Sequence, residues 1–431
     1  MNFDIIFYNV LTIGVCMKLY SYDCVVVGGG AAGMAAALEV KRNNFSVAII
    51  EREEFLGGIL LQCIHNGFGL HEFKEELTGP EYAERFETKV LSSGVEIFLE
   101  TTAVDIKNRG SYKEIYAVSK KYGGFIINSK AVVLSMGCRE RNRGNIGIPG
   151  SRPAGVFTAG LAQRLVNIEG YVPGKEIVVV GSGDIGLIMA RRMTWSGCKV
   201  KAVIEIQPYP SGLPRNIALC LNDFDIPLHL NSSVINIHGK ERVERLDIVT
   251  KNPSIPEQPK YFSIDCDTVL LSVGLIPENE LSKKAGIQIN PENNGPYVDS
   301  FMTTNVEGIF ACGNALHVHD LVDFVTEESR RTGNFVSRYL NNDSPIKQYK
   351  IKAGANVRYV TPQKINPGSD NTLYLRPMIV KDSATLNVAA DDKIIYSKNL
   401  KYIRPSEMIK ISLLKENIGS VSDIEFEISL A

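Results

Sequence analysis

The sequence lacks paired cysteines: its eight cysteines are scattered, and none belongs to a C-x-x-C pair. This scatter argues against a zinc site, an iron–sulfur cluster or a redox dithiol within the chain, so we predict no metal site. Scattered, unpaired cysteines fit a reducing compartment, and we therefore expect a cytoplasmic protein.

The sequence also lacks an excess of charge of either sign. It has 47 basic and 48 acidic residues, and its formal net charge is −1. Nothing basic points to a nucleic-acid partner, and no lysine-rich tail points to a membrane surface.

A long hydrophobic run is missing as well. Residues 1–16 are apolar, but they are too short for a comfortable membrane span. They carry Asp4 and have no basic start, which disfavours a signal peptide. We expect an N-terminal extension ahead of the first strand, and we expect no direct membrane span.

One glycine motif, G-x-G-x-x-G, occurs twice. Each copy follows a β-branched run, Val25–Val27 or Ile177–Val180, and precedes an apolar helical stretch. The glycines are Gly28, Gly30 and Gly33 in the first copy and Gly181, Gly183 and Gly186 in the second. In a dinucleotide site they turn the chain off the strand, admit a pyrophosphate and let the helix pack on the strand. The helix N-terminus then presents its N–H groups to the phosphates.

An acidic residue follows each copy at the expected place. Glu51 comes eighteen residues after Gly33, and Glu205 comes nineteen after Gly186. A carboxylate at the tip of the second strand accepts hydrogen bonds from a ribose hydroxyl. Because a carboxylate there repels a 2′-phosphate, Glu205 favours NAD over NADP. Two dinucleotide sites in one chain suggest that one nucleotide passes electrons to another.

Elsewhere the pattern predicts a helix over Pro80–Leu91, strands at Phe125–Ile127 and Ala131–Leu134, and a crossover over residues 144–176. After residue 371 the sequence alternates as in a small all-β domain. The strands predicted there are Leu373–Val380, Ala384–Val388, Lys393–Ser397, Met408–Leu413 and Ile424–Ile428, with a turn at Asp391-Asp392. This part holds no obvious catalytic constellation, so we expect it to serve packing or subunit contact.

The order of the motifs resembles that of the two-dinucleotide-binding-domain flavoproteins, which have the pyridine nucleotide–disulfide oxidoreductase fold. Ser135-Met-Gly137 and Ser272-Val-Gly274 resemble the segments where that chain leaves and re-enters its flavin domain. Thr303–Asn314 resembles the motif that binds the flavin ribityl chain.

The resemblance implies an α/β fold with two Rossmann-like domains, the NAD-binding one inserted in the FAD-binding one, and a small C-terminal all-β domain. The FAD-binding domain would be discontinuous, over residues 17–150 and 275–345. The NAD-binding domain would span residues 151–274, and the all-β domain residues 346–431.

FAD and NAD are the cofactors that the resemblance implies. The residues it places at FAD are Gly28, Gly30, Gly33, Glu51, Gly57, Gly58, Val104 (through its backbone, at the adenine), Gly137, Gly313 and Asn314. Those it places at NAD are Gly181, Gly183, Gly186 and Glu205, and Gly274 joins the cofactor-binding set where the chain returns.

The sequence departs from the disulfide branch of this family, which has G-G-x-C-x-x-x-x-C after its first acid. Leu60 and His65 occupy the two cysteine positions, so the disulfide relay of that branch is predicted to be absent. The ribityl motif ends in Asn314 where Asp is usual. The candidate catalytic residues are His65, Cys63 and His319.

A narrower resemblance is carried by Gly57–His71, Glu76–Ala83, Gly137–Arg141 and Ala311–Asp320. These segments are similar to the FAD/NAD-dependent oxidoreductases associated with anaerobic glycerol-3-phosphate dehydrogenase, which are related to the flavin subunits of hydrogen cyanide synthase and opine oxidase. The resemblance implies hydride transfer between NAD(H) and FAD, in either direction, with a partner subunit such as a glycerol-3-phosphate dehydrogenase, and a possible homo-oligomer. The alternatives are a stand-alone NADH oxidase and a non-catalytic flavin-binding assembly subunit.

Overall fold

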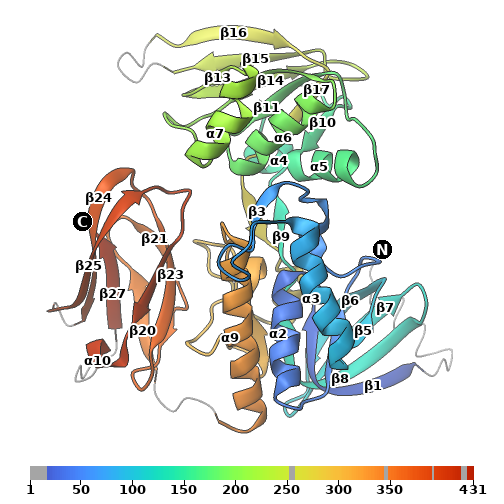
Figure 1. Cartoon of the computed structure of the whole chain (residues 1–431), viewed down its shortest axis with the longest axis vertical. Coiled ribbons are helices and arrows are strands. Elements are labelled where there is room, and N and C mark those ends of the chain that lie inside the picture. The colour runs from blue at the N-terminus through green and yellow to red at the C-terminus, as the bar shows by residue number, and fades with distance from the viewer. Residues whose placement is uncertain (1–16, 252–257, 344–347, 391–392, 419–424) are drawn as a thin grey trace.

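The computed structural model describes residues 17–251, 258–343, 348–390, 393–418 and 425–431. Figure 1 shows three bodies: an N-terminal unit completed by a late helix, an inserted unit above it, and a β-rich C-terminal unit beside it. The extension predicted at residues 1–16 lies outside the described residues.

The N-terminal unit is built on a seven-stranded sheet of order β5-β2-β1-β8-β7-β6, with β19 beside β8. The strands that pair in parallel are β1 (Lys18–Val27), β2 (Val47–Ile50), β5 (Glu96–Phe98), β8 (Gly123–Leu134) and β19 (Ile309–Ala311). An antiparallel pair, β6 (Thr101–Asn108) and β7 (Lys113–Ser119), continues the sheet from β8. Two strands were predicted over residues 125–134, but β8 is continuous because Ser129 between them is buried and paired on both sides.

Three helices cover one face of this sheet. They are α2 (Ala31–Arg42), α3 (Gly79–Ser93) and α9 (Val322–Leu340). The helix predicted over Pro80–Leu91 is thus confirmed as α3, whose start is fixed by a capping box between Thr78 and Glu81. Short elements between them are η1 (Gly58–Gln62), β3 (Asn66–Phe68), β4 (Leu77–Thr78) and η3 (Gly313–Ala315).

The inserted unit has a parallel five-stranded sheet of order β10-β17-β11-β12-β13. Its strands are β10 (Val156–Thr158), β11 (Glu176–Val180), β12 (Lys199–Ile204), β13 (Leu228–His229) and β17 (Thr268–Leu271). One face packs against α5 (Ala159–Asn167), α6 (Asp184–Trp195) and α7 (Pro214–Cys220), with η2 (Asn222–Phe224) following. The other face packs against an antiparallel sheet of β14 (Ser232–His238), β15 (Arg245–Thr250) and β16 (Lys260–Asp265).

Two antiparallel strands join the N-terminal and inserted units. They are β9 (Cys138–Glu140) and β18 (Leu275–Pro277). The short helices α4 (Arg143–Ile146) and α8 (Glu280–Lys284) lie just beyond them along the chain. The chain therefore leaves and re-enters the N-terminal unit through one ribbon.

The C-terminal unit consists of two sheets around one apolar core. One sheet has the order β22-β20-β27-β24-β25 and the other β21-β23-β26. Their elements are β20 (Tyr349–Ala353), β21 (Val357–Thr361), β22 (Lys364–Ile365), β23 (Asn371–Pro377), β24 (Lys381–Ala390), β25 (Lys393–Ile403), β26 (Ile409–Leu413), α10 (Lys415–Ile418) and β27 (Glu425–Leu430). All five strands predicted from alternation are found, whereas the turn at Asp391-Asp392 and Ile424 lie outside the described residues.

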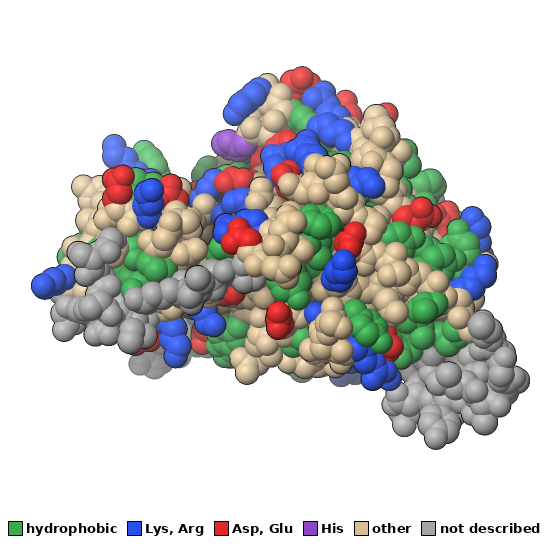
Figure 2. All heavy atoms as spheres, turned by 90° about the horizontal axis from the view of Figure 1, so that it is seen from below, with side chains coloured by type: hydrophobic (Ala, Val, Ile, Leu, Met, Phe, Trp, Pro, Cys, Tyr) green, Lys and Arg blue, Asp and Glu red, His purple; other side chains and the backbone are tan. Residues whose placement is uncertain are grey.

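The predicted fold class, two Rossmann-like units plus a small all-β unit, is confirmed. None of the helices in the described part of the chain has the length and apolarity needed to cross a bilayer. On the face seen in Figure 2, acidic and basic side chains are interspersed, in keeping with the net charge of −1.

Close packing of α2 on α9 depends on Gly333. A Cβ atom at this position would lie 2.5 Å from the Ala36 carbonyl oxygen and 2.7 Å from the Glu39 Cβ, both on α2. We expect Gly333→Val to push the helices apart, at a cost of about 1–3 kcal/mol in the free energy of unfolding. Thermal unfolding should show a lower midpoint than for Gly124→Ala, because a Cβ at Gly124 meets no atom within 4 Å. Equal midpoints would contradict this account of the packing.

Candidate active site

Two of the predicted site residues of the N-terminal unit, Gly28 and Glu51, lie at one edge of its sheet. Val27 is paired with Ile50 and with Leu134, and Leu134 is paired with Ala311. The residues that follow these four strand ends are Gly28, Glu51, Ser135 and Cys312. Ligands of open α/β sheets bind at the carboxyl ends of the strands, so this edge is where a cofactor is expected.

The first glycine motif leaves an open cradle at the start of α2. Gly30 precedes the helix without a side-chain cap, and a Cβ built on it would meet no atom within 4 Å. Gly28, with a φ of +103°, already lies against the chain, since its Cβ would be 2.5 Å from the Ser135 carbonyl oxygen. The uncapped N–H groups and the open space beside Gly30 fit a pyrophosphate.

Glu51 is buried beside this cradle. Its Oε2 accepts a hydrogen bond of 2.6 Å from the Gly29 N–H, and its Oε1 accepts one of 2.9 Å from the Glu53 N–H. An ionised carboxylate has about four acceptor positions, so each oxygen retains capacity for a ribose hydroxyl. Val104 lies at a bulge between β6 and β7, and its carbonyl oxygen accepts from Lys284 Nζ at 3.3 Å.

The second motif repeats this device in the inserted unit. Gly183 precedes α6 without a side-chain cap. Glu205 Oε2 accepts from the Ser182 N–H at 2.9 Å, from the Ser182 hydroxyl at 2.6 Å and from the Ser211 hydroxyl at 3.1 Å. Neither serine was predicted as a site residue, although Ser182 stands inside the motif. Gly186 packs against Ser272, so the helix lies close to the strand as the motif requires.

Gly137, Gly313 and Asn314 come together where β8, β9 and β19 meet. A Cβ on Gly137 would meet no atom within 4 Å, which leaves space beside the chain. The Asn314 Oδ1 accepts from the His319 N–H at 3.0 Å, and its Nδ2 donates to Cys138 Sγ at 3.7 Å. Burial raises the pKa of Cys138 to about 11, so its sulfur is a neutral thiol.

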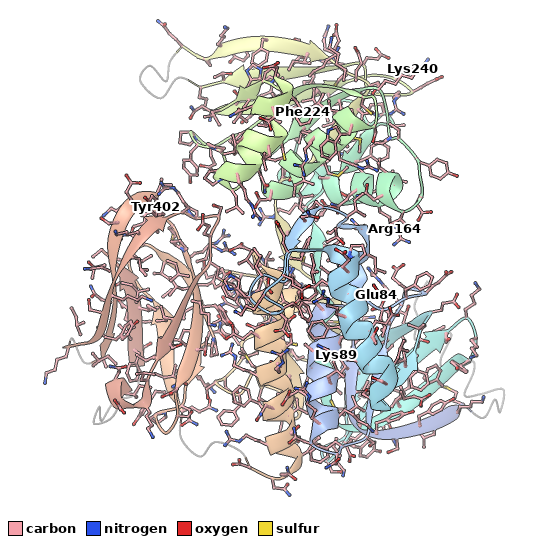
Figure 3. All side chains as sticks on the ribbon, viewed as in Figure 1. Glu84, Lys89, Arg164, Phe224, Lys240 and Tyr402 are labelled. Carbon is pink, nitrogen blue, oxygen red and sulfur yellow. The ribbon has the colours of Figure 1, made fainter. Side chains whose placement is uncertain are left out.

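The segment that carries cysteines in the disulfide branch lies between the two units. Gly58 lies over the first cradle, because a Cβ atom built on it would lie 3.3 Å from the Gly30 Cα. Gln62 Nε2 donates to the Gly160 carbonyl at 2.9 Å and to Gln163 Oε1 at 3.0 Å, both on α5. An ion pair of 3.2 Å between Arg164 and Glu53 adds to this contact, and Figure 3 shows Arg164 at the junction.

Cys63 is buried in this junction and its sulfur lies 3.8 Å from Gln163 Oε1. Burial raises the pKa of Cys63 to about 12. A thiolate is the reactive form of cysteine, so the surroundings of Cys63 oppose the redox role predicted for it.

His65 faces the inserted unit. Its Nδ1 lies 3.1 Å from the Asn66 carbonyl oxygen, and its buried Nε2 has no hydrogen-bond partner among the described residues. Burial lowers its pKa, and the charges of Arg191 and Arg215 lower it further. His65 is therefore a neutral imidazole at neutral pH with one nitrogen available to a ligand.

His319 belongs to a buried cluster with His317 and Glu328, whose side chains are all 0% exposed. Glu328 lies on α9 and was not predicted. Its oxygens lie 2.8 Å from His317 Nε2 and 3.2 Å from His319 Nε2, and its Oε1 accepts from the Gly313 N–H at 2.8 Å. The structure thus brings His319, Gly313 and Asn314 together, whereas His65 lies in the junction with the inserted unit.

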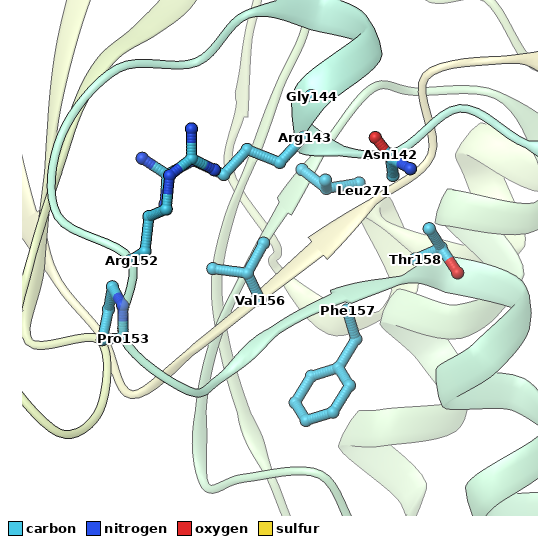
Figure 4. Close-up of a pocket in the computed structure, with 9 residues that line it drawn as sticks. All are labelled: Asn142, Arg143, Gly144, Arg152, Pro153, Val156, Phe157, Thr158 and Leu271. Carbon is cyan, nitrogen blue, oxygen red and sulfur yellow. The ribbon is translucent and has the colours of Figure 1, made fainter. Parts of the chain in front are cut away.

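A cavity of about 400 Å³ lies beside the ribbon that joins the units. Arg143 and Arg152 line it, and Figure 4 shows their side chains extending towards one another. Burial and the charge of Arg152 lower the pKa of Arg143, which donates to the carbonyl oxygens of Ile148, Pro149, Gly150 and Ser151. Arg143 therefore holds the connecting loop in place.

Residues 22–330 match the family described as pyridine nucleotide-disulphide oxidoreductase. The chain belongs to that family, whose cofactors are FAD and NAD(P)H. The two cradles described above fit these cofactors, because both helix starts are uncapped and both carry a buried acid beside them.

Among curated proteins, the chain is similar to an opine oxidase subunit of Agrobacterium tumefaciens (strain Ach5), at 26% identity over 68% of this chain and 61% of that protein. It is 27% identical to NADH oxidase of Methanocaldococcus jannaschii, over 70% of this chain and 64% of that protein. The chain thus spans less than two thirds of the length of either relative. The crystal structure of T. acidophilum thioredoxin reductase has the same fold, with a TM-score of 0.60 and 23% identity over 74% of this chain and 98% of that one.

Replacing Gly30 or Gly183 with alanine tests the two cradles independently of one another. Both have ordinary negative φ values, of −74° and −65°, so alanine fits the backbone. We expect Gly30→Ala to lower the FAD content of purified protein, because the methyl group occupies the phosphate space. Gly183→Ala should leave FAD content unchanged and weaken NADH binding about tenfold or more. Each variant controls for the other, and a variant that alters both cofactors equally would contradict the assignment.

Cys63→Ala tests the buried thiol. Since the sulfur is protonated and covered, we expect the rate of flavin reduction by NADH to stay within about twofold of wild type. Mass spectrometry after iodoacetamide treatment of the native protein at pH about 8 should find Cys63 unmodified. A large loss of reduction rate with FAD content intact would restore Cys63 as a redox residue.

Proposed function

We propose that the chain is the flavin subunit of an NADH:acceptor oxidoreductase. Hydride passes between NAD(H) and bound FAD, and the electrons are exchanged with a partner subunit or acceptor rather than with a disulfide of this chain. The chemistry of electron storage belongs to FAD, while the protein binds and orients both cofactors. Nothing in the two sites favours one direction of transfer over the other.

The observation that carries this proposal is the pair of equivalent cradles in two units joined by one ribbon. In both, the backbone N–H inside the glycine motif donates to the acid at the end of the next strand, Gly29 to Glu51 and Ser182 to Glu205. The ribbon of β9 and β18 and the contact of Gln62 with α5 bring the units against one another. Such an arrangement supports close approach of the nicotinamide ring of NAD(H) and the flavin ring of FAD.

An internal disulfide relay is not part of the proposed reaction. Leu60 and His65 stand where the disulfide branch has its cysteines, and Cys63 contacts Gln163 instead of another cysteine. All seven cysteines in the described residues are free. His65 has a neutral imidazole in the junction between the units. It is the candidate to contact the bound flavin or nicotinamide ring, or a group that donates a proton to that ring.

NAD is proposed over NADP because Glu205 occupies the ribose end of the second cradle. A buried carboxylate held by two serine hydroxyls and a serine N–H cannot swing away, and it repels a 2′-phosphate.

The proposed partner is a protein subunit, in the first place a glycerol-3-phosphate dehydrogenase. The similarity to a protein named as one subunit of opine oxidase supports an assembly of several chains. The C-terminal unit lies beyond the family match, and it exposes large apolar side chains such as Ile394 and Tyr402, the latter marked in Figure 3. This unit is the proposed contact for a partner or for a second copy of the chain.

A stand-alone NADH oxidase is the second candidate. The similarity to an NADH oxidase over 70% of this chain favours it. In that case molecular oxygen, rather than a protein, would take the electrons from the flavin.

Mixing anaerobic protein with NADH in a stopped-flow instrument tests both candidates. We expect the flavin absorbance to bleach, because the inserted unit brings NADH to FAD. Slow reoxidation in air, on a scale of minutes, is expected for a subunit that awaits its partner. Reoxidation within seconds would instead favour the oxidase.

The Gly183→Ala variant is the matched control, since it should bleach only at much higher NADH concentrations. No bleaching of FAD-loaded wild type would contradict both enzymatic functions and would favour a non-catalytic flavin-binding assembly subunit.

A further inference from the structure

The cluster of His317, His319 and Glu328 is a buried charge that the proposed hydride transfer does not use. Its three side chains are 0% exposed, and Glu328 is ionised because both imidazoles hold its pKa well below the usual value despite the opposing effect of burial. Burial lowers the pKa of His317. The cluster therefore holds a carboxylate charge next to at least one neutral imidazole.

Each imidazole of the cluster has one nitrogen that could take a proton. The Nε2 atoms of His317 and His319 lie against Glu328, so each donates its proton to a carboxylate oxygen. The Nδ1 atoms of both rings are buried and have no hydrogen-bond partner among the described residues. Protonation of one Nδ1 would make an imidazolium that stays paired with Glu328.

The cluster is joined directly to the residues predicted to lie along the flavin. Glu328 Oε1 accepts from the Gly313 N–H at 2.8 Å, and the His319 N–H donates to Asn314 Oδ1 at 3.0 Å. Gly313 in turn lies against Ala32 in the first turn of α2, beside the first cradle. The Glu328 carboxylate therefore repels negative charge that appears on the cofactor, and the repulsion is strong because little water lies between them.

The charged groups that surround the cluster already have partners. On the C-terminal unit, Arg376 pairs with Asp320 at 2.9 Å and Lys410 pairs with Glu327 at 2.5 Å. On α9, Asp323 accepts from the Glu72 N–H, and Arg331 donates to the Tyr374 hydroxyl at 3.2 Å. The other titratable groups around the cluster are the thiols of Cys138 and Cys312 and the phenols of Tyr359 and Tyr374. Burial raises the pKa of all four groups, so they are neutral.

We propose that this cluster takes up one proton from solvent whenever the bound flavin accepts a hydride, and releases it when the electrons leave. The hydride brings two electrons and one proton nucleus to FAD, which leaves one additional negative charge there. The solvent proton binds to Nδ1 of His317 or His319 and balances that charge. This inference rests on the proposed function for the source of the hydride, but the proton uptake itself requires only a flavin beside Gly313.

A bound metal ion is the alternative occupant of the cluster, because the candidate ligand atoms of its three residues lie within 4.8 Å of one another. Histidines that bind a metal almost always donate their second ring N–H to an acceptor. Both Nδ1 atoms lack such an acceptor among the described residues, which disfavours a metal.

The test is the pH dependence of the reduction potential of bound FAD in the holoprotein, titrated with dithionite and mediator dyes between about pH 7 and about pH 9. Two protons per two electrons should change the reduction equilibrium about a hundredfold per pH unit, which is about 59 mV. In Glu328→Gln, only the proton on the flavin remains, so we expect about tenfold per pH unit, about 30 mV.

His317→Gln, which retains the FAD-binding residues and leaves His319 as the only imidazole of the cluster, is the second variant. A one-proton slope in this variant assigns the proton to Nδ1 of His317, and a two-proton slope assigns it to Nδ1 of His319. His238→Gln is the matched control, because His238 forms its own pair with Asp247 in the inserted unit and should keep the wild-type slope. A one-proton slope in wild-type holoprotein would overturn the proposal, whatever the variants do. One equivalent of metal retained per chain and lost in His317→Gln would overturn it too.

The outcomes for the two proposals are distinguishable. If NADH fails to bleach the flavin but the dithionite titration shows two protons, the proposed function fails and the proton uptake stands. If NADH bleaches the flavin and the slope is that of one proton, only the proton uptake is overturned.

Discussion

The structure depends on a shared sheet edge, at which four parallel strands of the N-terminal unit end level with one another. The register that pairs Val27 with Ile50 and Leu134, and Leu134 with Ala311, puts the glycine turn, the buried acid and the Gly313–Asn314 segment at the same edge of the sheet. A slip of one residue would turn the buried side chains to the opposite face. The apolar cores on both faces of the sheet therefore hold the site in place.

The inserted unit has the same contact between a glycine motif and an acid, made with different side chains. In both units a backbone N–H inside the glycine motif donates to the acid on the next strand, but Glu205 also receives two serine hydroxyls. Extra donors make the second carboxylate more rigid and leave it fewer free acceptor positions. The two candidate sites thus have one architecture and differ in how many donors each carboxylate already accepts from.

Much of this arrangement could be predicted from local sequence. The glycine motifs and their acids located both cradles, and alternation located the C-terminal strands, because a short window of residues determines turns and periodicity. Contacts between distant segments could not be predicted in this way. Glu328 meets His317 and His319 only because α9 packs behind η3, and Gln62 meets Gln163 across 101 residues of chain. Continuity of β8 through Ser129 likewise comes from its neighbours in the sheet, since polar residues there suggested a break.

The late position of β19 has a consequence for how the protein is made. Its three residues, Ile309–Ala311, complete a sheet whose first strand begins at Lys18, while the parallel sheet of the inserted unit is complete by Leu271. On the ribosome, the inserted unit can therefore reach its native structure before the unit that surrounds it. If the N-terminal unit holds FAD, as proposed, we expect FAD to bind only after β19 has been synthesised, so the order of translation separates folding of the inserted unit from loading of the flavin.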